Sequence, residues 1–375
     1  MVLPMTLGLD RFPSVVAAIQ DGIQRSVHTG VQIYVAVNSR PVLNAGVGEA
    51  APGKPMTPTT IMPWRSAAKP ITATLVLRAV QEDRLSLDAR LSDLLPASQS
   101  TDKANLTLLQ LLTHQSGFPA TDTGWPHVSW NESVRRSLET LCTLEPGSAA
   151  YHPQSSWFLL GEILRELEER RTGVRASFET LLRRDLLDPL QMDQTWCGIP
   201  ESQQDGLQDR QPQLYDRDRG QLQPSPYSAG PWLTAPSAGG NIRGPVSQLG
   251  LFLEMLLRQG QLSDGSDYLS PTSVNRILMR HRTGLFDQTL QHVIDFGLGI
   301  IRDSKHYGPE TVPYGFGKDC SSESFGHGGS QCSIGFCDPE RALVVAWSAN
   351  GFCGEGQHQR RNRMINDAIY KDLGL

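Results

Sequence analysis

The sequence predicts an α/β fold of the α+β type, in which one antiparallel sheet is assembled from both ends of the chain. Residues 31–48 and 333–348 show the short, β-branched runs and tight turns that are typical of strands. Residues from about 105 to 290 show mainly the periodicity of amphipathic helices. Strands at both ends with helices between them favour a sheet that carries a helical insertion.

The N-terminal elements are a helix and a hairpin. Apolar side chains at helical spacing predict a helix over residues 14–28. Residues 31–37 and 42–48, joined by a short turn, predict two antiparallel strands. A loop rich in Pro and Gly then leads to an apolar helix that begins near Ser66 and ends near Asp83.

The inserted region contains further predicted helices over residues 106–113, 157–170 and 246–258. On the second of these, Glu162 falls on the outer face, and we expect it to be solvated or to tether a loop. Residues 201–226 are rich in Gln, Asp, Arg and Pro and have few apolar anchors. They are therefore predicted to form an exposed loop or lid.

The C-terminal region returns to strands and ends in a helix. Strands are predicted over residues 296–301, 333–337 and 342–348, and a last helix over 357–370. This order divides the chain into two predicted domains. Residues 1–65 and 291–375 form the sheet domain, and residues 66–290 form the mainly helical domain.

Composition and charge exclude several classes of protein. The chain has 375 residues, of which 39% are apolar, and a net charge of -5 without charge runs. Such a chain buries a sizeable core but presents no basic stripe, so we expect no nucleic-acid partner and no anionic-membrane partner. The longest apolar run, residues 71–80, is too short to cross a bilayer and includes Arg78.

The N-terminus and the cysteines favour a cytoplasmic protein. Residues 1–11 lack the basic start and the long apolar stretch of a secretory signal. The six cysteines have no framework spacing, which predicts reduced thiols. Cys320, Cys332, Cys337 and Cys353 match no zinc pattern, so no metal is expected.

One stretch carries a chemical signal, because Ser66 and Lys69 lie three residues apart where an apolar helix begins. Residues at this spacing share a helix face, so the hydroxyl and the amine can meet. A lysine that burial keeps neutral can take the proton of a serine. The same spacing recurs at Ser100 and Lys103, but in a polar loop where the lysine is expected to stay solvated and protonated.

Further motifs follow Ser66 and Lys69 in a recognisable order. They are Leu85-Ser86-Leu87-Asp88, Leu111-Leu112-Thr113-His114-Gln115-Ser116-Gly117, Pro146-Gly147 with Tyr151 four residues later, and Phe325-Gly326-His327-Gly328-Gly329. The whole resembles the serine β-lactamase-like family, in particular its class C β-lactamase, D-Ala-D-Ala carboxypeptidase and family VIII esterase branch. The resemblance covers nearly the full length. It implies the β-lactamase/transpeptidase-like fold, with the active site between the two predicted domains.

The resemblance implies a role for each matched residue. Ser66 is expected to attack a carbonyl and form an acyl-enzyme, while Lys69 takes its proton. Tyr151 is expected to relay protons to and from the reacting groups, with the pKa of its hydroxyl lowered by Lys69. The backbone amides of Ser66 and Ser330 are expected to form the oxyanion hole.

His327, Gly328 and Gly329 match the Lys-Thr-Gly triplet of the family, or its His-x-Gly version in esterases, on a strand that lines the site. Glycines there let the strand approach a substrate closely. The alternatives are that Tyr151 is a core tyrosine and that His327 is a structural histidine packed by Phe325. Two other histidines are left outside the set: His152 is expected to point away from Tyr151, and His114 to cap or pack the helix before it.

Two departures from the family pattern bear on the substrate. Penicillin-recognising members carry an asparagine two residues after the tyrosine, where this chain has Pro153. His327 replaces the lysine that opens the triplet. Both changes remove contacts that a peptide or a β-lactam uses. Together with the absence of a visible export signal, they favour a cytoplasmic serine hydrolase or acyltransferase, of the Ser-x-x-Lys type, that acts on a small ester, thioester or amide.

Two other functions stay open: a β-lactamase or D-amino-acid peptidase (carboxypeptidase), and a non-catalytic binding protein with the same fold. The expected partners are a small-molecule acyl donor and, if the acyl group is transferred, a small-molecule acceptor. No cofactor is expected, since the chemistry needs none. Gln331, Trp125 and Trp232 are the candidate pocket residues. The motifs are the same whether water or another nucleophile accepts the acyl group.

Overall fold

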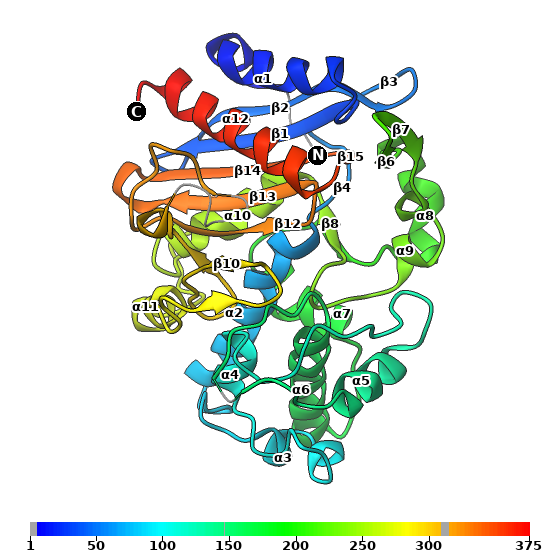
Figure 1. Cartoon of the computed structure of the whole chain (residues 1–375), viewed down its shortest axis with the longest axis vertical. Coiled ribbons are helices and arrows are strands. Elements are labelled where there is room, and N and C mark those ends of the chain that lie inside the picture. The colour runs from blue at the N-terminus through cyan, green and yellow to red at the C-terminus, as the bar shows by residue number, and fades with distance from the viewer. Residues whose placement is uncertain (1–5, 146, 309–314) are drawn as a thin grey trace.

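A computed structural model describes residues 6–145, 147–308 and 315–375. Its centre is a seven-stranded antiparallel sheet in the order β11-β12-β13-β14-β1-β2-β3 (Figure 1). The strands are β1 (Gly30–Val37), β2 (Arg40–Ala51), β3 (Lys54–Pro55), β11 (Ile301–Arg302), β12 (Phe325–Gly329), β13 (Ser333–Asp338) and β14 (Leu343–Ala349). Strands from both ends of the chain form one sheet, and this confirms the predicted fold class.

β1 and β14 join the two ends of the chain in the middle of this sheet. Val35 of β1 lies opposite Val345 of β14 on one side and Leu43 of β2 on the other. All three side chains are fully buried. The continuous apolar runs of these strands are therefore explained by helices that cover both faces of the sheet.

One face of the sheet is covered by α1 (Pro13–Gln24) and α12 (Glu355–Leu373), which lie side by side at the top of Figure 1. Ile19 of α1 and Ile369 of α12 are fully buried in the same apolar cluster. The carboxylate of Asp372 accepts hydrogen bonds from backbone amides in the first turn of α1. This carboxylate satisfies N–H groups that have no partner inside the helix.

The opposite face is covered by α10 (Val246–Leu257), which packs on β1, β13 and β14. Phe252 of α10 is buried with Tyr34 and Ala346 of the sheet. The same apolar cluster continues into the helical region. α10 thus belongs in sequence to the predicted helical domain, residues 66–290, yet it packs on the sheet.

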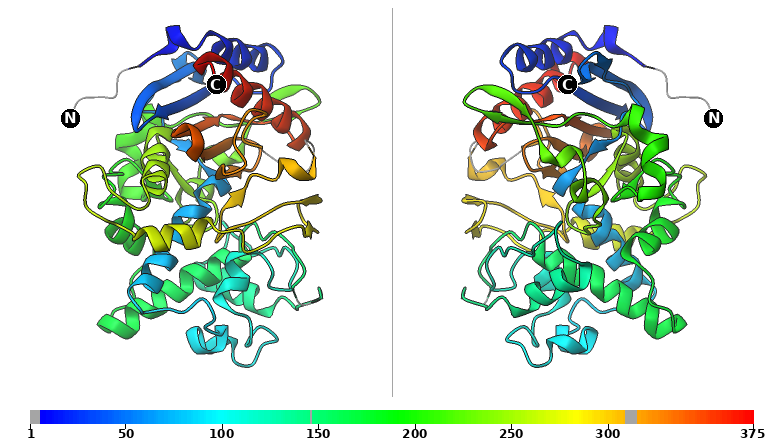
Figure 2. Two further views of the ribbon diagram at one scale, coloured as in Figure 1. Left: turned by 90° about the vertical axis from the view of Figure 1, so that its left-hand side faces the viewer. Right: turned by 90° about the vertical axis from the view of Figure 1, so that its right-hand side faces the viewer.

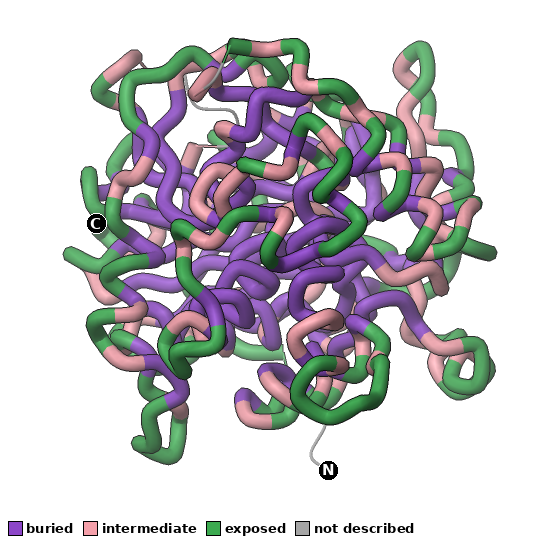
Figure 3. The backbone as a smooth tube through the Cα atoms, turned by 90° about the horizontal axis from the view of Figure 1, so that it is seen from below, coloured by how far each residue is buried: buried purple, intermediate pink, exposed green. Residues whose placement is uncertain are grey.

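The helical region is built around α2, which runs through its centre (Figures 1 and 2). Its helices are α2 (Lys69–Gln81), α3 (Leu91–Leu94), α4 (Leu108–Leu112), α5 (Trp130–Glu139), α6 (Ser155–Thr172), α7 (Phe178–Leu182) and α11 (Pro271–Leu278). Residues 69–77 of α2 are all buried. Figure 3 shows the buried backbone in the interior and the exposed segments around the edge. No helix in the described part of the chain is long and apolar enough to span a membrane.

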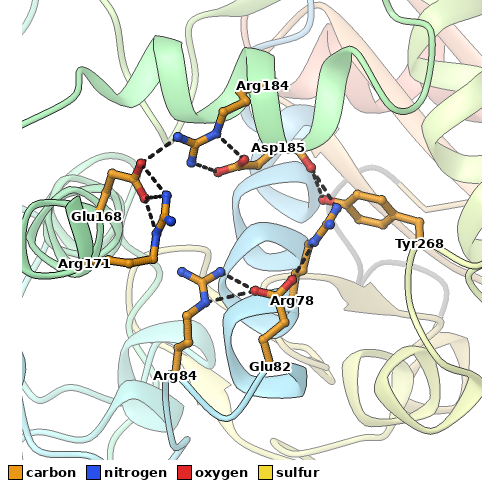
Figure 4. Close-up of polar contacts among 8 residues, drawn as sticks. All are labelled: Arg78, Glu82, Arg84, Glu168, Arg171, Arg184, Asp185 and Tyr268. Carbon is orange, nitrogen blue, oxygen red and sulfur yellow. Dashed lines mark hydrogen bonds and ion pairs between the residues drawn. The ribbon is translucent and has the colours of Figure 1, made fainter. Parts of the chain in front are cut away.

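A network of ion pairs surrounds a cavity of about 380 Å³ between α2 and α6 (Figure 4). Its charged residues are Arg78, Glu82, Arg84, Glu168, Arg171, Arg184 and Asp185. Each arginine is paired with a carboxylate, and Glu168 of α6 accepts from both Arg171 and Arg184. Arg78 and Tyr268 both donate to the backbone oxygen of Asp185. The network therefore links α2, α6 and the π-helical turn Arg183–Leu187.

Residues 201–226 do not form the loop that their composition predicts. They contain α8 (Glu201–Leu207) and a hairpin of β6 (Tyr215–Asp218) and β7 (Gln221–Pro224). β6 also pairs in parallel with β15 (Gly351–Phe352). Leu214, beside β6, is buried against Phe352, so one apolar anchor and a strand pairing fix this segment.

The strand predicted over residues 296–301 is much shorter in the structure. Of the predicted range, only Ile301 belongs to a strand, β11. The chain turns at Gly299, whose φ is 67°, and a bridge pairs Phe296 with Ile301. The remaining short elements are α9 (Pro231–Thr234), β4 (Met62–Pro63), β5 (Trp196–Cys197), β8 (Ile242–Gly244), β9 (Phe286–Asp287) and β10 (His292–Val293). β4, β8 and β5 form one small sheet, and β9 and β10 form another.

Lys103 and Glu162 are both buried. The prediction that Lys103 stays solvated is therefore wrong, and so is the solvated alternative for Glu162. Lys103 pairs with Asp102 at 3.0 Å and donates to the backbone oxygens of Leu138 and Thr140, at the end of α5. A cation at the carbonyl end of a helix is favourable. Glu162 accepts hydrogen bonds from side chains of neighbouring segments, which confirms the tethering alternative.

Candidate active site

Ser66 lies in η2 (Arg65–Ala68), a 3-10 turn that runs directly into α2. Lys69 is the first residue of α2 and is fully buried. Its Nζ lies 3.1 Å from the Oγ of Ser66. The same Nζ donates to the backbone oxygens of Pro153 at 2.7 Å and Gly239 at 2.6 Å. The predicted serine and lysine are therefore in hydrogen-bond contact.

Burial holds the pKa of the Lys69 amine well below its ordinary value, and the positive charge of Arg65 lowers it further. A neutral amine has two N–H donors and one lone pair. The carbonyls of Pro153 and Gly239 take the two donors. The lone pair is left for Ser66, so Lys69 is placed to accept the hydroxyl proton.

Tyr151 reaches Ser66 from the segment that precedes α6. Its hydroxyl is hydrogen-bonded to Ser66, and the Nζ of Lys69 lies 5.2 Å from the centre of its ring. The prediction that Lys69 lowers the pKa of Tyr151 is wrong. Burial raises this pKa, and the hydrogen bond to Ser66 opposes the shift only in part. Tyr151 therefore stays protonated and can act as a proton donor.

His327 lies in β12, with its ring centre 5.9 Å from that of Tyr151. Its Nδ1 is 2.7 Å from the backbone oxygen of Gly328. Because a carbonyl only accepts, Nδ1 carries the proton and Nε2 is an acceptor. Nε2 is buried and has no partner among the described residues. Burial lowers the pKa of His327 to about 3, so the ring is neutral.

Gly329 allows β12 to lie directly against η2. A Cβ atom on Gly329 would lie 2.3 Å from the backbone oxygen of Trp64 and 2.0 Å from the Oγ of Ser333. Ser333 donates to that same Trp64 oxygen at 2.6 Å. The strand that bears His327 is thereby held beside the turn that bears Ser66.

A cleft of about 380 Å³ opens over Ser66. Among the predicted site residues, Ser66, Tyr151, His327, Gly328 and Ser330 line it. Lys69 and Gly329 lie directly behind this surface, where they contact η2. The chain thus brings together residues from η2, from the segment before α6 and from β12 and the turn that follows it.

The three candidate pocket residues do not line this cleft in the described part of the chain. Trp125 packs edge-on against Trp232 at 5.2 Å, and Trp232 packs against Tyr227 at 4.1 Å. Gln331 accepts a hydrogen bond from the amide of Gly354 at 2.8 Å. These side chains contact neighbouring segments instead.

Sequence reasoning missed a buried ion pair between Arg282 and Asp287, 3.0 Å apart. The Oδ1 of Asp287 accepts hydrogen bonds from the amides of Tyr151 at 3.0 Å, Thr289 at 3.0 Å and Leu290 at 2.9 Å. Thr289 and Leu290 line the cleft. One carboxylate therefore fixes Tyr151 and two further residues of the cleft wall. No local motif marks it, since Asp287 follows Tyr151 by 136 residues.

Arg361 of α12 was also missed. It is buried, and its guanidinium donates to the backbone oxygens of Gln331 at 2.6 Å and Gly351 at 3.2 Å. Because Ser330 directly precedes Gln331, Arg361 anchors the turn that presents the Ser330 amide. The sequence signal is weak: Arg361 lies four residues before Ile365, on the apolar face of the last helix.

His152 points away from the cleft, as predicted, with its Nε2 2.7 Å from the backbone oxygen of Phe118. The ring of His114 packs 4.7 Å from that of Tyr151, and its Nδ1 accepts from the amide of His152. Pro146 of the Pro146-Gly147 motif lies outside the described residues. Within the described ranges, no three His, Cys, Asp or Glu side chains gather as a metal-ligand set.

The chain matches the Beta-lactamase family model over residues 15–369, and it therefore belongs to the Beta-lactamase family. Penicillin-binding protein 4 of Amycolatopsis lactamdurans is 28% identical over 319 residues, which cover 82% of this chain and 77% of that protein. The predicted family resemblance is thereby confirmed.

Two solved structures illustrate the fold. EstCE1, described as a hydrolase with promiscuous acyltransferase activity, matches with a TM-score of 0.79 and 18% identity, over 96% of this chain and 99% of that chain. A family VIII carboxylesterase matches with a TM-score of 0.77 and 20% identity, over 99% of this chain and 100% of that chain. At these identities the likeness establishes the β-lactamase/transpeptidase-like fold.

Proposed function

We propose that this protein is a serine hydrolase or acyltransferase that forms an acyl-Ser66 intermediate from a small ester, thioester or amide. The observation that carries the proposal is the position of the Lys69 Nζ, 3.1 Å from the Oγ of Ser66. The two other hydrogen bonds of this nitrogen are made to backbone carbonyls. A nucleophile in contact with a buried, neutral base is the arrangement that acyl transfer requires. Membership of the Beta-lactamase family supports the same chemistry.

The first half of the proposed reaction acylates Ser66. Its Oγ attacks the substrate carbonyl carbon as Lys69 takes the hydroxyl proton. The backbone amides of Ser66 and Ser330 stabilise the negative oxygen of the tetrahedral intermediate. Tyr151, kept protonated by burial, gives its proton to the leaving group as the bond from carbonyl carbon to leaving group breaks. The proton held by Lys69 then returns Tyr151 to its neutral form.

The second half releases the acyl group. Water or another hydroxyl, thiol or amine gives its proton to the Lys69 and Tyr151 pair and attacks the acyl carbon. The bond to Ser66 breaks, and Ser66 recovers its proton. The same residues serve hydrolysis and transfer, so the choice depends on which nucleophile the cleft of about 380 Å³ admits.

Two features of the site support an ester or thioester over a β-lactam or peptide. Pro153 has no side-chain donor, and its backbone oxygen is taken by Lys69. His327 offers a neutral acceptor where the family triplet has a cation. The hydrolase and acyltransferase described for EstCE1 carries the same fold. A β-lactamase or D-amino-acid peptidase, and a non-catalytic binding protein, are the alternatives that the experiment below distinguishes.

We also propose a cytoplasmic setting. All six cysteines carry free thiols. Thiols persist in reducing compartments, whereas oxidising compartments favour disulfides.

Turnover of a short-chain 4-nitrophenyl ester tests the proposal. We expect a burst of nitrophenol equal to the enzyme concentration, followed by slower steady turnover. Loss of the burst in Ser66→Ala, with labelling of Ser66 by a fluorophosphonate in the unmodified chain, would support the acyl-enzyme. Hydrolysis of nitrocefin in preference to esters would favour the β-lactamase alternative. If the protein shows no turnover and Ser66 is not labelled, the result would support the alternative of a non-catalytic binding protein.

A further inference from the structure

Arg65 directly precedes Ser66 and lines the same cleft. Its guanidinium carbon lies 4.6 Å from the centre of the Tyr227 ring and 5.7 Å from that of the Phe352 ring. Tyr227 packs in turn on Trp232, which packs on Trp125. A guanidinium that rests on aromatic rings is restricted in orientation and keeps its charge.

The guanidinium of Arg65 contacts these aromatic rings but no polar group in the described part of the chain. Among the described residues it forms no ion pair and no hydrogen bond, although a guanidinium carries five N–H donors. The arginines around the cavity in Figure 4 differ, because each of them is paired with a carboxylate. Arg65 therefore brings unsatisfied, charged donors to the cleft.

The backbone at Arg65 is held in an unfavourable conformation. Its φ is 50°, in the left-handed region that glycine adopts more readily than a residue with a long side chain. β12 is also shaped around this residue, since a Cβ atom on Gly329 would lie 3.0 Å from the Cβ of Arg65. A charged side chain kept in a strained position beside the nucleophile indicates a role in the site.

We propose that Arg65 binds a carboxylate of the acyl donor, so that esters or thioesters carrying one negative charge are the preferred substrate class. This inference rests on the proposed function, because the carboxylate and the acyl group occupy one cleft. A guanidinium and a carboxylate match in a bidentate geometry. Glu355, at the start of α12, also lines the cleft.

Two matched pairs of esters test this inference, each with one neutral and one carboxylated member. The first pair, phenyl acetate and 3-carboxyphenyl acetate, places the charge on the leaving group. The second, 4-nitrophenyl hexanoate and the mono-4-nitrophenyl ester of adipic acid, places it on the acyl group. The readout is the ratio of kcat/KM for the charged ester to that for its neutral partner. Both members use Ser66 and Lys69, so a general change in reactivity cancels.

We expect a ratio above one in at least one pair, and a fall of about 10- to 100-fold in that ratio for Arg65→Gln. Arg65→Lys should retain part of the preference, and added salt should weaken it. Arg217→Gln is the matched control, because Arg217 of β6 donates to the backbone oxygen of Ser26 and does not line the cleft. This control should leave the ratio unchanged.

The outcomes separate this inference from the proposed function. One outcome is that neutral esters are turned over through Ser66 while both ratios stay at or below one, or while neither ratio responds to Arg65→Gln. In that case the role assigned to Arg65 is wrong, but the proposed function stands. If no ester is turned over and Ser66 is not labelled, the proposed function fails and the Arg65 inference fails with it.

Discussion

The Nζ of Lys69 lies 3.1 Å from the Oγ of Ser66, and two backbone carbonyls accept its other hydrogen bonds. The carbonyls belong to Pro153 and Gly239, from segments far from Lys69 in the sequence. The position of the base is therefore fixed by the fold as a whole.

Lys69→Met should lower kcat/KM for a neutral ester by about 100- to 10,000-fold, since methionine fills the space but accepts no proton. Lys103→Met is the matched control, because Lys103 is the buried lysine of the second Ser-x-x-Lys spacing, and its Nζ contacts Asp102, carbonyls at the end of α5 and the ring of Phe118. The control should lower the free energy of unfolding and leave the burst intact. Undiminished turnover in Lys69→Met would contradict the role of Lys69.

The pH dependence of kcat/KM should show a rising limb well below 10.5, the ordinary pKa of lysine, because only neutral Lys69 accepts a proton. The positive charge of Arg65 disfavours protonation of Lys69. Arg65→Gln should therefore raise the pKa of Lys69 and move the rising limb to higher pH. Initial rates with a neutral ester over a pH series measure this shift. A limb that does not move would disprove the coupling.

Tyr151→Phe should keep the fold, because the ring is packed in an apolar cluster, and should remove the proton donor. We expect kcat to fall by about 100-fold or more, with a smaller effect for esters whose leaving group needs no proton. Comparing a nitrophenyl ester with an alkyl ester of the same acid measures the difference. Equal losses for the two esters would argue against proton donation by Tyr151.

Asp287→Asn should destabilise the protein by about 3 to 5 kcal/mol, because it leaves the buried guanidinium of Arg282 without its counter-charge. Asp209→Asn is the matched control, since it removes the exposed pair with Lys54 and should change stability by about 1 kcal/mol or less. Urea unfolding monitored by fluorescence measures both. Similar losses in the two variants would show that the Arg282 and Asp287 pair is not the anchor of the Tyr151 segment.

Stability should fall as the pH drops below about 6.5, the pKa of histidine in an unfolded chain. Burial lowers the pKa of His28 and His327 to about 3, and that of His152 to about 4. Each histidine therefore binds a proton more tightly in the unfolded chain than in the folded one. Its contribution to the free energy of unfolding is complete above about pH 6.5 and is lost as the pH falls toward its pKa in the folded state. The expected slope is about 1.4 kcal/mol per pH unit for each histidine. Urea midpoints that stay constant between about pH 7 and pH 5 would contradict this.

Much of the fold could be predicted from local patterns. The apolar runs of β1 and β14 and the face of α6 predict their elements, because burial imposes those periods on the sequence. The segment 201–226 could not be predicted in this way. Its hairpin is held by pairing of β6 with β15, a contact that composition does not record.

The motif residues of the candidate site could be placed in order, and the structure brings Ser66, Lys69, Tyr151 and His327 together. Their electrostatics could not be predicted. The pKa of Tyr151 is raised because burial outweighs nearby charge, and burial is a property of the folded chain. The anchors Asp287 and Arg361 act on backbone groups remote in sequence, and such contacts leave no local motif.

The most direct test of the account is the intact mass of the protein after brief exposure to a panel of esters, thioesters and β-lactams. The account predicts one added acyl group from an ester or thioester, located on Ser66 by peptide mapping and absent in Ser66→Ala. An unmodified mass with every acyl donor, or an acyl group on another residue that Ser66→Ala leaves in place, would contradict it.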